Sequence, residues 1–426
     1  MTRTFSLSRR GLLAGIAGTA AASAFAPQAI SQTRAQLVVI GGGFGGATAA
    51  KFLKHFLPAA SVTLIEPNET YSACPFSNLV IGGLREMSAQ TFNYEGLKAL
   101  GISVIQDRAT GIDADTKTVS TAAGTKIQYD RLVLSPGIDI RWGALEGYDE
   151  AAAEIMPHAW KAGAQTMLLR RQLEAMEDGG LVVMSVPQAP FRCPPGPYER
   201  ASLIAHYLKT SKPNSKLLVL DAKDDFSKKP LFMKAWAERY PDHLEWRGAA
   251  DFGRVVSVDP STMTLSTDFE DIIADVANVI PPQKAGVIAE QAGIADETGW
   301  CPINPLDFSS PIHPDIHVIG DATIAAPMPK SAFSANLQAK FCAMQIARGL
   351  SGLEVEPTVL ANTCYSFLAP DAAISITGVY DNSDGKLTSI EGSGGLSSST
   401  PAEGEREAEA RQAEDWFAAI TRQAFQ

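Results

Sequence analysis

The sequence lacks several features that define common classes of protein. No apolar run from Gln36 onward is long enough to span a bilayer, so we expect no membrane insertion of the mature protein. No C-x-x-C-H segment occurs, and this chain therefore attaches no c-type haem of its own. The six histidines are scattered and no Cys/His cluster has zinc spacing, which predicts no metal site. The formal net charge of −11 makes the chain a poor candidate for nucleic-acid binding.

One Gly-rich nucleotide loop is present near the start of the chain. The apolar run Gln36–Ile40 leads into a G-x-G-x-x-G pattern, which is followed by a predicted helix from Ala47 to about Leu57. In this pattern Gly41 allows the tight turn, Gly43 lets the backbone approach a pyrophosphate, and Gly46 lets helix and strand pack closely. The next predicted strand ends on Glu66, whose carboxylate can accept both ribose hydroxyls. Strand, loop, helix, strand and acid in this order predict a dinucleotide site.

Two later segments indicate that the dinucleotide is FAD. Tyr129–Gly137 reads as a strand that ends in a Gly turn, and Asp315–Asp321 reads as another strand that closes on Gly320 and Asp321. A carboxylate at Asp321 can accept from a ribitol hydroxyl, while a helix from about Ser331 points its positive N-terminus at the flavin. Lys330 precedes that helix and could pair with the flavin's N1–O2 edge, although a solvated lysine is an open alternative.

The segment Leu181–Tyr207 reads as a strand, a stiff turn and a helix start, where a related enzyme would carry a second Gly-rich loop for NAD(P)H. Here Pro187–Pro197 replaces the glycines with prolines and one cysteine, Cys193. Proline removes the backbone N–H donors that a phosphate needs, so we expect no NAD(P)H site. Glu199 follows at the helix start, where it could relay a proton or cap the helix; we favour the cap.

The N-terminus carries an export pattern. Arg9 and Arg10 precede an apolar, Ala-rich stretch, which is typical of a twin-arginine signal within residues 1–34 and predicts a periplasmic protein exported by that route. Ala24 and Ala26 suit signal peptidase, but Pro27 leaves the cleavage site undecided.

The order of predicted elements indicates an α/β fold with two Rossmann-like domains, the second without a nucleotide site, and a smaller C-terminal α+β domain. We expect a discontinuous FAD domain at 35–155 and 285–355, an inserted NAD-like domain at 156–284, and a C-terminal interface domain at 356–426. In the last domain we expect a strand at 372–380, turns or a flexible loop at 381–399, and a packed helix at 403–425.

Three segments with cysteines resemble the flavoprotein subunit of flavocytochrome c sulfide dehydrogenase. They are Thr70–Gly83 (TYSACPFSNLVIGG), Val186–Arg200 (VPQAPFRCPPGPYER) and Asn362–Ser366 (NTCYS). The resemblance runs from about Gln36 to the last helix, except that 381–408 could not be placed within it.

The resemblance implies a role for three of the five cysteines. Cys74 matches the cysteine that bonds covalently to the flavin, and Cys193 and Cys364 match a redox disulfide beside it; a purely structural disulfide remains an alternative. The family's substrate is hydrogen sulfide, and its partner is a c-type cytochrome subunit whose haem takes electrons one at a time. Cys342 is expected to be structural, and Cys301 remains unassigned.

Other functions remain open from the sequence. A sulfide:quinone oxidoreductase shares the same chemistry but needs a quinone pocket and a membrane-docking surface. A non-catalytic flavin-binding chaperone or carrier in sulfur oxidation is also open. An NAD(P)H-dependent disulfide reductase is disfavoured because a C-x₄-C pair and a second Gly-rich loop are both missing.

Overall fold

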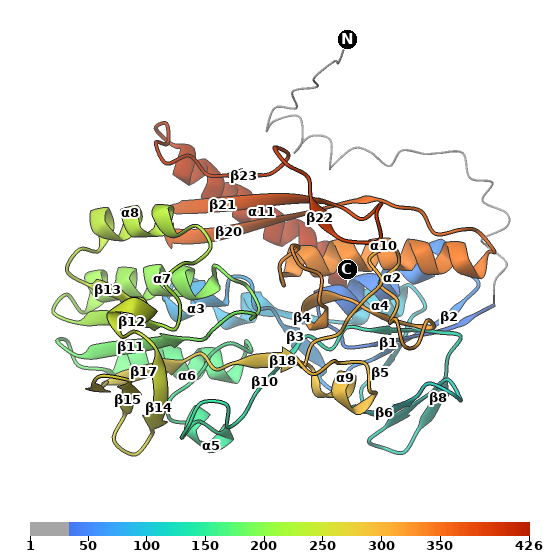
Figure 1. Cartoon of the computed structure of the whole chain (residues 1–426), viewed down its shortest axis with the longest axis horizontal. Coiled ribbons are helices and arrows are strands. Elements are labelled where there is room, and N and C mark those ends of the chain that lie inside the picture. Colours follow the sequence, from blue (N-terminus) through green and yellow to red (C-terminus); the bar gives the residue numbers. More distant parts are fainter. Residues whose placement is uncertain (1–33) are drawn as a thin grey trace, which may run out of the picture.

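The computed structural model describes residues 34–426 (Figure 1). The predicted export signal therefore lies, apart from its last residue, outside the described residues. Among the residues described, no helix is both long and apolar enough to cross a membrane.

The first large sheet has five parallel strands in the order β19-β9-β1-β2-β5. Its strands are β1 (Gln36–Ile40), β2 (Ser61–Ile65), β5 (Ser103–Ile105), β9 (Arg131–Leu134) and β19 (Ile316–Val318). Helices α2 (Phe44–Phe56) and α10 (Ala332–Leu350) pack against each other, and a hydrogen bond of 2.8 Å from Asn336 to Thr48 joins them. Because β19 comes far downstream of the other strands, two distant segments of chain build this sheet.

The second large sheet has four parallel strands in the order β13-β12-β11-β17. Its strands and neighbouring helices are α6 (Ala164–Ala175), β11 (Leu181–Val186), α7 (Gly196–Ser211), β12 (Lys216–Asp221), α8 (Lys229–Arg239), β13 (Leu244–Arg247) and β17 (Val276–Val279). The strands predicted at Leu181 and Lys216 are both present. Their apolar residues are almost fully buried, as expected for parallel strands covered on both faces.

The third layer is C-terminal and extends along both parallel sheets (Figure 1). It consists of β20 (Val359–Ala369), β21 (Ala372–Asp381), β22 (Thr388–Ser389), β23 (Gly395–Leu396) and α11 (Glu405–Phe425). The segment expected as turns thus contains two short strands that pair with β21. Helix α11 buries Phe417 and Phe425, and the Phe417 ring stacks on Phe76 with centroids 4.5 Å apart. This confirms a packed helix.

Smaller elements connect these layers. They are β3 (Thr70–Ser72), α3 (Ser77–Ile81), η1 (Met87–Gln90), β4 (Thr91–Asn93), α4 (Glu95–Ala99), β6 (Ala109–Asp113), β7 (Thr118–Thr121), β8 (Lys126–Gln128), β10 (Ile138–Ile140), α5 (Glu150–Ala153), η2 (Ala249–Asp251), β14 (Val255–Asp259), β15 (Thr264–Thr267), β16 (Asp271–Ile273), β18 (Gln283–Ala285), α9 (Val287–Gln291) and η3 (Gly320–Ala322). Strands β10 and β18 pair antiparallel between the two large sheets.

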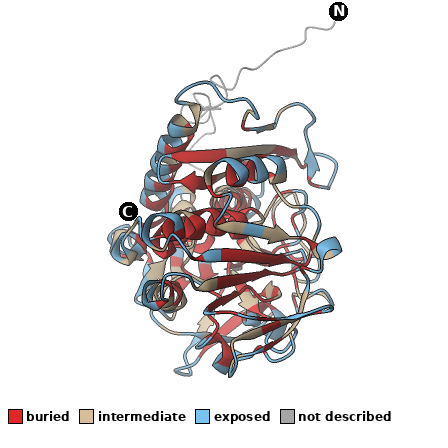
Figure 2. Ribbon diagram, turned by 90° about the vertical axis from the view of Figure 1, so that its left-hand side faces the viewer, coloured by how far each residue is buried: buried red, intermediate tan, exposed pale blue. Residues whose placement is uncertain are grey.

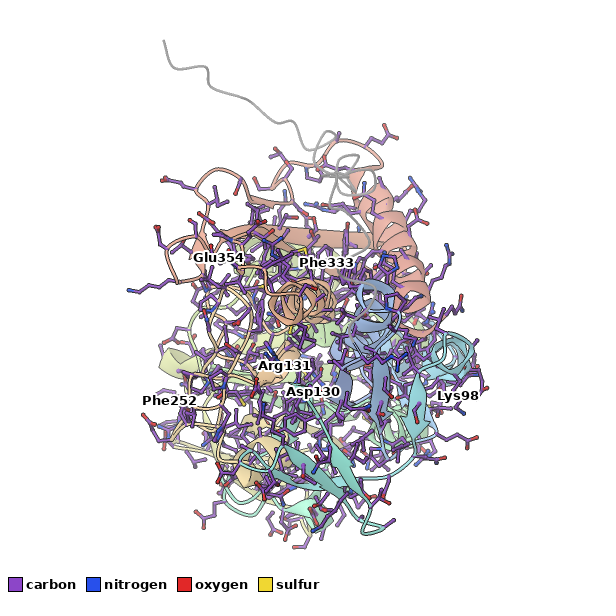
Figure 3. All side chains as sticks on the ribbon, turned by 90° about the vertical axis from the view of Figure 1, so that its right-hand side faces the viewer. Lys98, Asp130, Arg131, Phe252, Phe333 and Glu354 are labelled. Carbon is purple, nitrogen blue, oxygen red and sulfur yellow. The ribbon has the colours of Figure 1, made fainter. Side chains whose placement is uncertain are left out.

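Burial follows this layering. The strands of the sheets are mostly buried, whereas loops and the outer faces of helices are exposed (Figure 2). Phe252 and Lys98 lie on opposite sides of the molecule in Figure 3, and Phe333 lies at α10 below the C-terminal layer. The α/β class predicted from the sequence is confirmed.

Candidate active site

The candidate site is a cavity of about 870 Å³ lined by the Gly-rich loop, the Cys74 segment, the Cys193 turn, the start of α10 and strand β20. This volume lies in the range of cofactor sites. Nine of the residues predicted from the sequence line it: Gly41, Gly43, Glu66, Cys74, Cys193, Glu199, Gly320, Asp321 and Cys364. Two predicted residues, Gly46 and Lys330, do not.

The Gly-rich loop is closed so tightly that side chains are excluded. Gly41 has a φ of +97°, and a Cβ there would lie 2.2 Å from the carbonyl oxygen of Ser135. A Cβ on Gly46 would lie 1.8 Å from the carbonyl oxygen of Gly41. Gly46 does not line the cavity, but its missing side chain allows the start of α2 to pack against the carbonyl oxygen of Gly41. The loop leads directly into α2, whose N-terminus can hold a pyrophosphate.

Glu66 follows β2 directly and is buried. Its Oε2 accepts a hydrogen bond from the N–H of Gly42 at 2.8 Å, and its Oε1 accepts from the side chain of Asn68 at 2.7 Å. The carboxylate is thereby held against the Gly-rich loop, where a ribose would lie next to a bound pyrophosphate.

Asp321 supplies an unsatisfied acceptor at the opposite part of the cavity. Its Oδ1 is buried and has no hydrogen-bond partner, while its Oδ2 lies 4.0 Å from the guanidinium of Arg192. Burial raises the pKa of this carboxyl, and Arg192 opposes the rise. A buried acceptor without a donor is expensive unless a ligand satisfies it. A hydroxyl of a flavin side chain is a donor of the kind that Asp321 lacks.

Cys74 lies between β3 and α3 and is half-buried at the cavity. Its Sγ lies 3.7 Å from the carbonyl oxygen of Trp160. The side chain of Arg192 also donates to this carbonyl, so the thiol and the guanidinium share one acceptor. The thiol is therefore accessible from the site that the Gly-rich loop and Asp321 define.

The structure brings Cys193 and Cys364 from different layers to the same cavity. Cys193 lies in the turn after β11 with a φ of +56°, and its N–H donates to the carbonyl oxygen of Lys330 at 2.8 Å. Cys364 lies within β20. A non-glycine residue in the left-handed region is uncommon and often marks a functional turn. Both cysteines are free thiols in the structure, so the disulfide between them stays a prediction.

Glycine at position 196 leaves space for the first of these thiols. A Cβ on Gly196 would lie 3.0 Å from the Sγ of Cys193 and 2.9 Å from the ring of Trp160. Burial raises the pKa of the Cys193 thiol far above its ordinary value, and the nearby Cys364 adds to the rise. Burial also raises the pKa of Cys364, and the hydrogen bond that Asn362 donates to its sulfur opposes the rise.

The helix cap expected of Glu199 is wrong. Helix α7 has no side-chain cap, and the buried carboxylate of Glu199 instead accepts from the side chain of Asn78 at 2.7 Å and from the N–H of Phe367 at 2.9 Å. Burial raises the pKa of Glu199, and these two donors oppose the rise. Glu199 thus links the Cys74 segment to the strand that carries Cys364.

The pairing of Lys330 with a flavin edge is not supported by its position. The Lys330 ammonium donates to the carbonyl oxygen of Asp321 at 3.0 Å and lies 3.8 Å from the ring centroid of Trp300, away from the cavity lining. A freely solvated lysine does not describe it either, because the ammonium donates to the carbonyl oxygens of Asp321 and Thr323; burial lowers the pKa of Lys330 to about 8. Lys330 therefore stabilises two loops by hydrogen bonds: its ammonium binds the carbonyl oxygen of Asp321, and its own carbonyl oxygen accepts the N–H of Cys193.

Sequence reasoning missed two buried cations that frame the site. Arg200 donates to the side chains of Asn78 and Asn278, each at 3.0 Å. Lys228 donates to the carbonyl oxygen of Cys364 at 3.0 Å and to Ser366 Oγ at 2.8 Å. Arg200 stood within a segment that carried the family resemblance. Lys228 had no local signal, because its partners come from a strand far along the chain.

The acid that ends β12, Asp221, is bonded by the chain's own side chains. Asp221 is fully buried and accepts from the hydroxyl of Tyr198 at 2.7 Å and from the indole of Trp246 at 3.2 Å. The Tyr198 ring stacks on Phe226 with centroids 3.5 Å apart. The chain's own aromatic side chains therefore occupy the region beside this carboxylate. Within residues 34–426, no group of three His, Cys, Asp or Glu could hold a metal.

The fold, and a cavity lined by a Gly-rich loop, Glu66 and Asp321, are those of a flavin-dependent oxidoreductase, and three family models agree. Residues 35–165 match the pyridine nucleotide-disulphide oxidoreductase model. Residues 166–281 match the central domain of the sulfide dehydrogenase [flavocytochrome c] flavoprotein chain, and residues 356–425 match the flavocytochrome c sulphide dehydrogenase flavin-binding domain. The chain belongs to the flavocytochrome c sulfide dehydrogenase flavoprotein family, and its cofactor is FAD.

Individual relatives include a sulfide dehydrogenase flavoprotein chain, a sulfide:quinone oxidoreductase and a sulfide-quinone reductase. The chain is 56% identical over 45 residues to the sulfide dehydrogenase flavoprotein chain of Chlorobaculum thiosulfatiphilum, which covers 11% of this chain and 94% of that relative. It is 23% identical over 309 residues to the mitochondrial sulfide:quinone oxidoreductase of Mus musculus, which covers 68% of this chain and 65% of the mouse protein. It is 31% identical over 172 residues to the sulfide-quinone reductase of Aquifex aeolicus, which covers 40% of this chain and 38% of that relative.

Solved structures share the fold. The sulfide:quinone oxidoreductase of Aquifex aeolicus superposes with a TM-score of 0.71 at 18% sequence identity, covering 91% of this chain and 92% of that one. A persulfide reductase from A. fulgidus, described as NAD-dependent, superposes with a TM-score of 0.59 at 16% identity, covering 91% of this chain and 77% of that one.

Proposed function

We propose that this protein is a sulfide dehydrogenase that oxidises hydrogen sulfide and passes the electrons to a c-type cytochrome. The observation that carries this proposal is the convergence of Cys193 and Cys364, from two different layers, on the cavity that fits FAD. A structural disulfide has no need to face a cofactor cavity. A redox disulfide must do so, because its electrons have to reach the flavin.

In this proposal Cys193 and Cys364 cycle between a disulfide and two thiols. Hydrosulfide is a good nucleophile toward a disulfide sulfur, and its attack yields a persulfide and a thiolate. Bound FAD supplies the chemistry that accepts an electron pair and releases single electrons. Glu199, buried near both thiols, takes the proton of hydrogen sulfide; burial raises the pKa of this carboxyl, which favours its protonated form.

We further propose that Cys74 holds FAD covalently. Its half-buried thiol lines the cavity next to Arg192, with which it shares the carbonyl oxygen of Trp160. The residues Gly41, Gly43, Gly46, Glu66, Gly320 and Asp321 would hold the rest of the cofactor. Covalent attachment suits a protein exported by the twin-arginine route to the periplasm, where no FAD is made. The haem that receives the electrons lies on a partner cytochrome subunit.

The division into an FAD domain at 35–155 and 285–355, an inserted domain at 156–284 and a C-terminal domain at 356–426 is also a proposal. It agrees with the separate sheets and with β19 joining the first sheet from downstream. We also propose that the inserted domain binds no NAD(P)H; the Pro-rich turn and the hydrogen bonds that Tyr198 and Trp246 donate to Asp221 support this proposal.

A sulfide:quinone oxidoreductase is the second candidate, favoured by the similarity to enzymes of that name. The test compares electron acceptors. Purified holoprotein is mixed with sulfide and, in separate reactions, with oxidised cytochrome c, a soluble quinone, or no acceptor, while flavin bleaching and acceptor reduction are followed.

We expect sulfide to bleach the flavin and cytochrome c to be reduced much faster than quinone. Faster quinone reduction would instead establish the second candidate. Failure of sulfide to bleach the flavin at all would favour a non-catalytic carrier. Cys342→Ala is a matched control, because Cys342 is buried in α10 and does not line the cavity.

A further inference from the structure

The two cysteines of the proposed redox pair have unequal surroundings. The Sγ of Cys364 accepts a hydrogen bond from the side-chain amide of Asn362, with a donor–acceptor distance of 3.2 Å. The Sγ of Cys193 receives no hydrogen bond from any residue in the described range 34–426. A thiolate at Cys364 would therefore be held by a donor that a thiolate at Cys193 lacks.

The amide of Asn362 is fixed in the orientation that this contact needs. Asn362 is buried, and its Oδ1 accepts from the hydroxyls of Ser331 and Ser334 at 2.5 and 3.1 Å. Both serines belong to the start of α10, where the Ser331 hydroxyl also caps the helix by accepting the N–H of Ser334. With Oδ1 occupied by two donors, the amide nitrogen must face the sulfur of Cys364.

A buried cation also contacts the backbone of Cys364. The ammonium of Lys228 is buried beneath β20 and donates to the carbonyl oxygen of Cys364 at 3.0 Å. The titratable groups around Cys364 are Cys193, Glu199, Lys228 and Tyr380. Burial raises the pKa of Cys364 and Glu199 adds to the rise, whereas Asn362, Lys228 and Ser331 oppose it. Burial also raises the pKa of Cys193, where Cys364 and Glu199 add to the rise and Arg192 and Lys228 oppose it. The hydrogen bond from Asn362 is therefore the contact that distinguishes the two thiols.

We propose that disulfide cleavage has a fixed direction: hydrosulfide attacks Cys193, and Cys364 departs as a thiolate that Asn362 holds. The new bond joins the sulfide sulfur to Cys193 Sγ, and the bond between the two Sγ atoms breaks. Its electron pair stays on Cys364 Sγ, and Cys193 carries the persulfide. The proton of the attacking HS⁻ remains on that persulfide or passes to Glu199.

This direction follows from leaving-group chemistry. In thiol–disulfide exchange, the sulfur whose thiolate is better stabilised leaves faster. A hydrogen bond to a charged group is stronger than one between neutral groups, and it is strongest in a site closed to water. Asn362 therefore acts as a positioning residue, because it works through Cys364 and does not itself touch the substrate. The inference rests on the proposed function, since it assigns roles within the same disulfide.

Mapping the persulfide in the wild-type holoprotein tests this directly. Oxidised protein is mixed anaerobically with one equivalent of sulfide, quenched rapidly with iodoacetamide and digested with trypsin. The cleavage sites place Cys193 and Cys364 on separate peptides, 193–200 and 349–386. We expect the alkylated persulfide on peptide 193–200 and a simply alkylated thiol on peptide 349–386.

The reverse distribution would overturn the inference and leave the proposed function intact. If sulfide opens no disulfide between these peptides, the proposed function itself fails, and the inference fails with it. The two failures are therefore distinguishable.

A variant tests the part played by the amide. Asn362→Asp keeps an acceptor for Ser331 and Ser334 but removes the donor and adds a negative charge beside Cys364. In the reduced protein, the pH midpoint for alkylation of Cys364 should rise by about 1–2 units. Persulfide formation in the oxidised protein should slow about tenfold or more.

The matched control is Asn382→Asp. Asn382 is a buried asparagine just after β21, and its amide is bonded to Thr358 and Pro305 rather than to a thiol. The Asn382→Asp variant should keep the wild-type pH midpoint for alkylation of Cys364 and the wild-type rate of persulfide formation. Equal midpoints and rates in the two variants would overturn the role of Asn362. If Asn362→Asp does not fold, Asn362→Ala is measured in its place against the same control.

Discussion

The contribution of the buried His158 imidazole to folding stability should fall when the pH drops from 7 to 5, because burial opposes its protonation. His158 is 4% exposed, and its Nδ1 accepts a hydrogen bond from the N–H of Trp160 at 2.9 Å. Protonation of Nδ1 would break this hydrogen bond and place a positive charge in a buried position. Burial lowers the pKa of His158 to about 3, and the nearby Arg200 adds to the effect. The ordinary value in an unfolded chain is about 6.5.

These two values determine the sign and the size of the effect. Because the pKa is lower in the folded state, the unfolded state binds the proton first. Stability is therefore fully present above about pH 6.5 and is lost as the pH falls toward 3. Linkage between an unfolded pKa of about 6.5 and a folded pKa of about 3 gives a loss of about 2 kcal/mol between pH 7 and pH 5.

The test is urea denaturation of the holoprotein at both pH values, comparing wild type with His158→Asn. Asparagine can still accept the N–H of Trp160 but does not titrate, so the variant should lose about 2 kcal/mol less than wild type. Buried carboxyls such as Glu199 and Asp321, whose raised pKa values act in the opposite direction, titrate in both proteins and cancel. His55→Asn, at an exposed histidine, should behave like wild type. Equal losses in wild type and His158→Asn would refute the reasoning.

Three further predictions follow from the cofactor site. Acid precipitation should leave the flavin colour on wild-type protein, whereas Cys74→Ser should release it; freely extractable FAD in wild type would contradict covalent attachment. Gly46→Ala would place a Cβ 1.8 Å from the carbonyl oxygen of Gly41, so purified protein should contain several-fold less FAD by absorbance. The control variant is Gly349→Ala, whose added Cβ meets nothing within 4 Å and which should retain its FAD. NADH without sulfide should not bleach the flavin, because the second sheet has a Pro-rich turn and the Tyr198 stack; rapid bleaching would show that a nicotinamide site exists after all.

The sequence predicted best those parts of the site that depend on local backbone geometry. Gly41 has a positive φ and Gly46 packs against the carbonyl oxygen of Gly41, while the position of Glu66 follows from the end of one strand, so spacing alone could locate all three. The packed helix at the C-terminus was also predictable, because its apolar residues recur on one face.

The sequence predicted least well where a polar side chain finds its partner in another layer. Glu199 stands at a helix start, where a cap is the local expectation, yet its acceptors are used by Asn78 and Phe367. The ammonium of Lys330 turns away from the cavity because backbone carbonyls and Trp300 satisfy it. Lys228 could not be found at all, since nothing near it in the sequence reveals the strand that it supports.

The central claim is that Cys193 and Cys364 form the redox pair through which sulfide reduces the flavin. The most direct measurement is sulfide-dependent cytochrome c reduction by Cys193→Ser and Cys364→Ser, each checked for bound FAD and for folding. We predict that both variants keep their flavin and lose most of this activity, while Cys342→Ala retains it. A merely structural bridge would contribute about 2–5 kcal/mol to stability, and its removal would leave turnover intact. Near wild-type turnover in both folded, flavin-loaded serine variants would contradict the account.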